Sequence, residues 1–204
     1  MYSPPYNQIE DRAELIQFMR ANGFPVLVTG TGGVLHASHL PVAVHEHSGQ
    51  IVVDMHMAKN NPQWQEFFDD EVLVIFSGPH AYVSPRWYAD KERVPTWNYA
   101  AVHAYGVPVV ISERKAKAES QRRLIESLDP AWLPKHDALS EKYVDQMLDG
   151  IVNFSIPVAR IETRWKLSQN RGRREMELIA AQLEKSADSG ERALAELTRK
   201  HFPA

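Results

Sequence analysis

Apolar and polar positions alternate over much of the first half of the chain, most clearly in VPTWNYAAVHAYGVPVVI, residues 94–111. A period of two predicts a strand, because successive side chains point to opposite faces. One face carries the rings of Trp97, Tyr99, His103 and Tyr105, with Ala101 among them. The other face, which we expect to point inward, carries Asn98, Ala100, Val102, Ala104 and Gly106.

Other segments have the same β-rich texture. They cover residues 25–30, 34–46, 50–57, 71–78, 80–84 and 151–167. Turn signals separate several of them, at residues 30–33, at 47–49 and at Gly78-Pro79. Short strands joined mostly by short turns favour an antiparallel sheet or barrel over a parallel layout with crossover helices.

Helical periodicity marks the remaining parts of the chain. Residues 11–22 predict an amphipathic helix that ends before Gly23, and Asn61 and Pro62 predict the start of one or two helical turns. Four further helices are expected at residues 112–128, 140–148, 173–185 and 191–200. We expect one domain over residues 1–185, and a loosely attached helical tail over 186–204.

Composition limits the function. The chain has 204 residues, a formal net charge of −3 and no cysteine. The charge argues against binding nucleic acid through broad electrostatics, and the lack of cysteine excludes disulfides and thiolate chemistry. The N-terminal residues do not form a secretion signal, and no apolar run approaches the ~20 residues that span a bilayer, so we expect a cytoplasmic protein. No histidine spacing predicts a metal site.

Lys59 and Asn60 stand where a strand is expected to end and a helical turn to begin. A cation and free backbone N–H groups at such a point suit a phosphate group. The alternative is that Lys59 is simply solvated and that Asn61 only caps the turn. A second polar run, Lys166, Ser168, Gln169 and Asn170, suits either the polar edge of a ligand or an exposed loop.

Two basic clusters bear on DNA binding. Both are interleaved with glutamate, which favours a solvated helix face over a recognition surface. The clusters are Arg114, Lys115, Lys117, Arg122 and Arg123, and then Arg171, Arg173 and Arg174. A helix-turn-helix pattern is not evident.

Five separated blocks resemble the PaiB family of FMN-binding split-barrel proteins. The blocks are SHLP (38–41), HMAKNNPQW (56–64), VLVIFSGPHAYVSPRWY (72–88), VPTWNYAAVHAYG (94–106) and WKLSQNR (165–171). The resemblance extends from Tyr2 to about Leu183, and the residues beyond look like a variable tail. It implies an α+β, mainly β fold, namely a six-stranded antiparallel Greek-key split barrel with flanking helices. It also implies a homodimer with FMN at the subunit interface.

The resemblance further implies a set of cofactor residues. Lys59 and Asn60 would hold the phosphate, with Lys166 as a second cation. His39, Leu40, His56, Met57 and Ala58 would line the flavin ring, and the ringed strand would face the second subunit. The alternative for the ringed strand is that the helix expected at residues 112–128 of the same chain packs on it. Trp97 and Asn98 would come from that subunit, and Gln169 and Asn170 would close the site. No residue stands out as a catalytic acid or base.

Three functions stay open. The first is a negative transcriptional regulator that binds DNA directly or through a partner, as the resemblance implies. The second is a flavin-dependent oxidoreductase that acts on a small molecule. The third is a split-barrel dimer without cofactor that serves as a binding scaffold.

Overall fold

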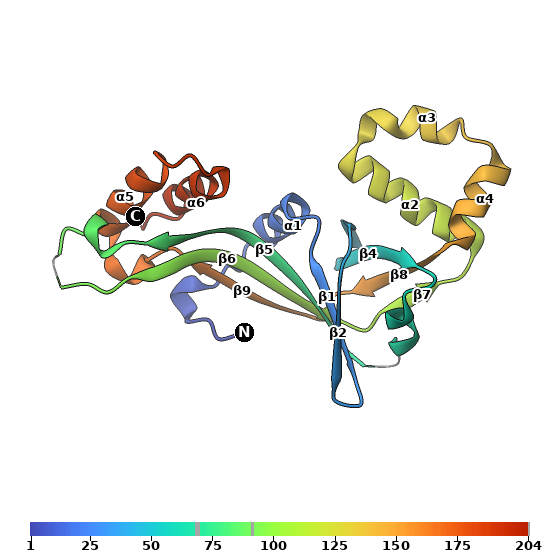
Figure 1. Cartoon of the computed structure of the whole chain (residues 1–204), viewed down its shortest axis with the longest axis horizontal. Helices are drawn as coiled ribbons and strands as arrows, with labels where there is room; N and C mark the ends of the chain where they lie inside the picture. The colour runs from blue at the N-terminus through green and yellow to red at the C-terminus, as the bar shows by residue number, and fades with distance from the viewer. Residues whose placement is uncertain (68–69, 91, 204) are drawn as a thin grey trace. The chain divides into compact units, whose positions relative to one another are not determined.

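The computed structural model describes residues 1–67, 70–90 and 92–203. Its strands form two antiparallel sheets, one in the order β2-β1-β5-β6-β9 and the other in the order β3-β4-β8-β7 (Figure 1). The strands are β1 Val26–Thr31, β2 Val34–His39, β3 Val42–His47, β4 Gln50–Ala58, β5 Val72–Val83, β6 Thr96–Gly106, β7 Val109–Ile111, β8 Ile151–Pro157 and β9 Arg160–Lys166. The mainly antiparallel fold class predicted from the sequence is confirmed.

The predicted helices are present with small shifts of their ends. The α-helices are α1 Arg12–Ala21, α2 Arg114–Leu128, α3 Leu133–Asp137, α4 Glu141–Asp149, α5 Arg173–Leu183 and α6 Ser189–Lys200. Short 3-10 helices are η1 Pro5–Asn7, η2 Pro62–Glu66, η3 Pro85–Trp87, η4 Pro130–Trp132 and η5 Gln169–Arg171. None of the described helices is long and apolar enough to cross a membrane.

The chain forms two compact units. One contains residues 1–11, 77–102 and 162–204, and the other contains residues 12–76 and 103–161. Strands β5, β6 and β9 run from one unit into the other, because each crosses one of these boundaries. We describe each unit separately and call them the terminal unit and the central unit.

In the central unit, the sheet of β3, β4, β8 and β7 has two different faces. One face buries Val53, Met55, Phe154 and Ile156 in the core. The other face carries polar side chains from paired positions, since Asp54 lies opposite Ser155 and His56 lies opposite Asn153. Helix α2 packs against β3 and β4, and Figure 1 shows α2, α3 and α4 grouped beside β4 and β8.

Strand β6 confirms the alternation predicted for the ringed segment. Its even-numbered residues from Asn98 to Gly106 are buried, whereas Trp97, Tyr99, His103 and Tyr105 are exposed or half-buried. Gly106 is required by a close approach, because a Cβ at this position would lie 2.2 Å from the carbonyl oxygen of Pro157. Arg160 stacks on the ring of Tyr105 at 3.5 Å, so the same chain supplies part of the cover of this face.

Two predictions were wrong, one about a turn and one about the tail. The expected turn at Gly78-Pro79 lies within β5, where proline is tolerated because β1 pairs only with Leu73 to Ile75 and has ended before it. The segments 34–46 and 151–167 are each divided into two strands that belong to different sheets. The helix expected to be loosely attached, α6, packs on α5 and fully buries Leu194 and Ala195.

Candidate functional site

The first group of predicted cofactor residues lies where β4 leaves its sheet, in the central unit. Ala58, Lys59 and Asn60 are exposed there. Asn61 caps η2, since its Oδ1 accepts the backbone N–H of Gln63 at 3.0 Å, and its Nδ2 lies 3.1 Å from the hydroxyl of Ser38. The end of β2 is therefore held beside the residue that follows Asn60, as the predicted grouping requires.

The segment after Lys59 is fixed to the β1–β2 hairpin. The buried amide of Gln63 donates from Nε2 to the carbonyls of Leu27 and His36, each at 3.3 Å. The indole N–H of Trp64 donates to the carbonyl of Lys59 at 3.0 Å. These contacts fix the backbone around Lys59 and leave its side chain in solvent.

The charge of Lys59 is the feature that suits a phosphate. Among the described residues, no carboxylate lies within ion-pair distance of its ammonium group. Helix η2 has only five residues and is a 3-10 helix, so its dipole adds little to the site. The predicted role of the helical turn is therefore reduced, and the ammonium of Lys59 carries the attraction for an anion.

The two neighbouring ring-lining candidates on β4 point to opposite faces of the sheet. Met57 is buried on the core face, whereas His56 lies on the polar face opposite Asn153. The Nδ1 of His56 and the Oδ1 of Asn153 are buried without a hydrogen-bond partner among the described residues. Burial lowers the pKa of His56 below its ordinary value, so the imidazole is neutral at pH 7.

His39 and Leu40 stand at the end of β2 and beyond it. The exposed imidazole of His39 stacks on Phe24, with 5.9 Å between the ring centroids. Leu40 is buried, and its backbone N–H donates to the carbonyl of Pro25 at 3.2 Å. Of this pair, His39 is the side chain that a ligand can reach.

The second group of candidates belongs to the terminal unit. Lys166 donates from Nζ to the carbonyl of Trp97 at 2.8 Å and also contacts the hydroxyl of Thr96. Partial burial lowers the pKa of Lys166, and the charges of Arg164 and Arg171 lower it further. The indole of Trp97 is 53% exposed, so this ring is available to a ligand or to a partner.

The amides predicted to close the site differ in what they can still bind. Asn98 is fully buried, and its Nδ2 lies 3.0 Å from the hydroxyl of Ser168. Gln169 accepts the N–H of Leu167 at 2.8 Å and donates to the carbonyl of Trp165. Asn170 is exposed. Asn98 and Gln169 therefore hold the loop after β9 in shape, and Asn170 keeps a free side chain.

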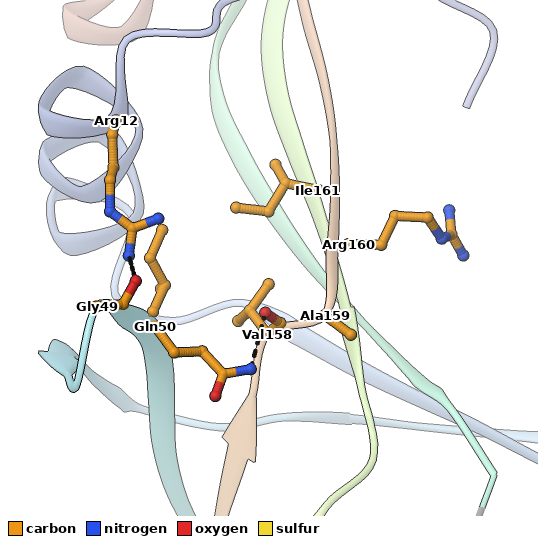
Figure 2. A pocket seen from close by; sticks show the side chains of 8 residues that line it. Arg12, Gly49, Gln50, Val158, Ala159, Arg160 and Ile161 are labelled. Atoms are coloured by element: carbon orange, nitrogen blue, oxygen red, sulfur yellow. Dashed lines mark hydrogen bonds between the residues drawn. The ribbon is translucent and has the colours of Figure 1, made fainter.

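Two surface pockets of the central unit lie outside the predicted cofactor set. The first has a volume of about 340 Å³ and is lined by Arg12, Gly49, Gln50, Ile51 and residues 158–161. Figure 2 shows Arg12 bonded to the carbonyl of Gly49 and Gln50 turned toward Val158, while Arg160 points away from the pocket. The second, of about 320 Å³, is lined by Arg20, residues 42–45 and residues of α2.

Sequence reasoning missed the polar contacts beneath α2. Two residues interpreted as part of a solvated helix face are in fact anchored. Arg123 donates from Nε to Oδ2 of the buried Asp54 at 2.8 Å, and Lys117 donates to the carbonyl of Ile151 at 3.0 Å. His45, which the sequence places beside a turn, also reaches Asp54, at 3.2 Å. The only sequence signal was Asp54 itself, a charge within an apolar strand.

Known proteins resemble this chain over most of its length. A family model described as "Putative FMN-binding domain" matches residues 1–160. Protease synthase and sporulation protein PAI 2 of Bacillus subtilis is 37% identical over 205 residues, which cover 97% of this chain and 96% of that protein. An uncharacterized protein of Emericella nidulans is 26% identical over 91% of each chain.

Solved structures share the fold at low sequence identity. The flavocytochrome Anf3 of Azotobacter vinelandii matches with a TM-score of 0.59 and 15% identity, over 77% of this chain and 68% of that chain. The FAD and heme binding protein of Mycobacterium smegmatis matches with a TM-score of 0.62 and 14% identity, over 78% and 73%. Both structures confirm the fold class, and their names describe flavin or heme proteins.

Proposed function

Because this chain belongs to the PaiB family of FMN-binding split-barrel proteins, we propose that it holds FMN by its phosphate at Lys59 and that the bound cofactor serves a regulatory function. The observation that carries this proposal is the exposed ammonium of Lys59, which has no carboxylate partner among the described residues. A dianionic phosphate needs charge-assisted donors of this kind. The side chain of Asn60 is exposed beside it and supplies an amide.

The remaining cofactor residues follow the same assignment. Of the residues assigned to the flavin ring, His39 and Ala58 are exposed and would contact it, and the half-buried His56 would do so as a neutral imidazole, whereas the side chains of Leu40 and Met57 are buried in this chain. In the terminal unit, Lys166, Gln169 and Asn170 would contribute polar groups. A bound flavin supplies electron-transfer chemistry that the side chains of this protein lack.

We further propose that two copies of the chain form a homodimer through the ringed face of β6. The support is that this face gathers stiff aromatic side chains that remain accessible. Trp97 is 53% exposed and Tyr82 is 45% exposed, and their ring centroids are 6.3 Å apart. Aromatic residues of this type are enriched in interface cores. In such a dimer, the exposed Trp97 of one subunit would complete the site of the other, and the buried Asn98 would hold the neighbouring loop through Ser168.

The regulatory function follows from the relative in Bacillus subtilis, whose name refers to protease synthesis and sporulation. Direct reading of DNA by α2 has little support in the charges of this helix. Arg114 pairs with Asp149 at 2.9 Å, Arg122 with Asp137 at 3.2 Å, and Arg123 with Asp54 at 2.7 Å. Since these arginines are neutralised within the chain, we propose that regulation passes through a protein partner.

Titration of the purified protein with FMN tests the cofactor assignment. We expect quenching of flavin fluorescence on binding, and Lys59→Ala should weaken FMN binding about 10- to 100-fold by removing a charge-assisted contact. Lys142→Ala, which removes an exposed lysine of α4, is the matched control and should bind like the wild type. Equal FMN affinity in Lys59→Ala and wild type would refute the phosphate assignment. Elution as a monomer from a sizing column would refute the shared site.

A further inference from the structure

Two lysines from distant parts of the sequence hold the same short turn between α4 and β8. The backbone N–H of Lys59 donates to the carbonyl of Gly150 at 2.9 Å. The ammonium of Lys117, from α2, donates to the carbonyl of Ile151 at 3.0 Å and also to the carbonyl of Leu148. The end of β4 and the first turn of α2 therefore meet at this turn, within the central unit.

The charges at this place are not balanced. Burial lowers the pKa of Lys117, and the nearby charges of Arg114 and Lys59 lower it further. Asp149 acts in the opposite direction, but its carboxylate is engaged by Arg114 at 2.9 Å. Within the described ranges, neither lysine has a carboxylate within ion-pair distance. Both lysines bond to this one turn, and a second positive charge near Lys117 favours the binding of an anion.

We propose that Lys117 is a second cation of the Lys59 site and that the FMN phosphate binds between the two ammonium groups. This inference rests on the proposed function. An ammonium group has three donors, and Lys117 uses two of them on carbonyl oxygens, which leaves one for a phosphate oxygen. A dianionic phosphate also removes the repulsion between the two lysines.

This arrangement links the cofactor to the helices α2–α4. Lys117 would contact the phosphate and the carbonyl groups at the end of α4 at the same time. A flavin without phosphate would still contact the residues assigned to the flavin ring, but it would not make the contact with Lys117. The phosphate therefore adds a contact to α2 that the flavin ring does not make. Comparing the affinities for FMN and riboflavin separates the contribution of the phosphate from that of the ring.

The test measures the dissociation constants of FMN and riboflavin for four proteins: wild type, Lys59→Met, Lys117→Met and Lys115→Met. We expect Lys117→Met to weaken FMN binding about tenfold or more and to leave riboflavin binding unchanged. Lys115 is an exposed lysine on the same helix, two residues away, so Lys115→Met should match the wild type. Damage to the residues assigned to the flavin ring would weaken FMN and riboflavin binding alike, so it cancels in the ratio of the two dissociation constants.

A second measurement avoids the loss of the side chain. The wild-type protein is labelled with ¹³C and ¹⁵N, the lysine Cε and Nζ resonances are followed against pH, and the Lys117 resonance is assigned through Lys117→Arg. FMN should raise the pKa of Lys117, because the phosphate stabilises its charged form, whereas riboflavin should leave this pKa unchanged.

The outcomes separate this inference from the proposed function. An unchanged FMN-to-riboflavin ratio in Lys117→Met, together with a lost preference for FMN in Lys59→Met, overturns the role of Lys117 alone. An equal loss in Lys115→Met overturns it too, since the effect would then come from the general charge of α2. A wild-type protein that binds neither flavin overturns the proposed function with it.

Discussion

The two helical additions to the sheets are held by opposite kinds of contact. In the terminal unit, α5 and α6 pack through fully buried apolar side chains, namely Met176, Ile179, Ala180, Leu183, Leu194 and Ala195. In the central unit, α2 has only two buried residues, Ser120 and Leu124, and polar groups make several of its contacts. Its contacts include the ion pair of Arg123 with Asp54 and the bonds of Lys117 to the α4–β8 turn.

This difference separates stability from specificity. Apolar packing is non-directional and stabilises in proportion to the area that it buries. Polar contacts contribute less to net stability but require one orientation of the helix, because a buried charge without its partner is costly. We infer that α5 and α6 stabilise the fold, whereas α2 is placed to respond to charge, as the proposed phosphate contact requires.

The largest expected effect on stability is in α5 and α6, which pack through apolar side chains. Leu183→Ala removes a fully buried side chain from α5 and should lower the free energy of unfolding by about 2–5 kcal/mol, through lost burial and the cavity left behind. Leu128→Ala, at the 58% exposed end of α2, should change it by less than about 0.5 kcal/mol. Urea denaturation followed by circular dichroism measures both. Similar values for the two variants would contradict the comparison.

A smaller effect on stability is expected for the polar contacts of α2. Asp54→Asn removes the charge that Arg123, His45 and Ser155 contact, and should lower the free energy of unfolding by about 1–3 kcal/mol. The expected loss of unfolding free energy is moderate because Arg123 is 38% exposed, and solvent screens its charge.

The control for Asp54→Asn is the corresponding substitution of Asp137, the carboxylate that pairs with Arg122, the arginine next to Arg123 in α2. Asp137→Asn breaks the pair with Arg122, in which both side chains are 47% exposed, and should lower the free energy of unfolding much less than Asp54→Asn, because solvent screens the exposed pair. Hydrogen exchange of α2 should rise in Asp54→Asn more than in Asp137→Asn. Equal costs for the two variants would show that Asp54 does not anchor the helix.

Local features of the structure could be predicted from the sequence because their causes are local. The alternation of β6 follows from the period of a strand, and Asn61 caps η2 through an N–H two residues away. In each case the partner lies within a few residues, and the sequence pattern contains it.

The polar contacts of α2 could not be predicted because their partners are distant in sequence. Arg123 and Asp54 are 69 residues apart, and Lys117 and Ile151 are 34 residues apart. A helix with alternating charges has the same pattern whether it faces solvent or a polar sheet. Likewise, the turn expected at Gly78-Pro79 depended on where β1 ends beside β5, which neither residue encodes. The resemblance supplied the candidate cofactor residues, and their roles stay predictions.

The smallest expected effect concerns pH and the half-buried imidazole of His56, on the polar face of β4. Unfolded His56 takes up a proton near pH 6.5, whereas in the folded protein burial lowers its pKa. Well above pH 6.5, where His56 is neutral in both states, the residue contributes nothing to the pH dependence. As the pH falls below 6.5, the unfolded state binds the proton first, so stability decreases, by at most ~1.4 kcal/mol per pH unit.

His56→Gln tests this titration because it removes the ionisable group and keeps a polar side chain. The difference in unfolding free energy between wild type and His56→Gln should shift in favour of the variant between pH 7.5 and 5.5. His47→Gln, at an exposed position of β3, should show a smaller shift. Asp54, Lys117 and Arg123 stay in place in both variants, so their charges do not change the comparison. Parallel pH profiles for His56→Gln and His47→Gln would mean that water reaches the polar face of β4 and β8 and hydrates the imidazolium of His56.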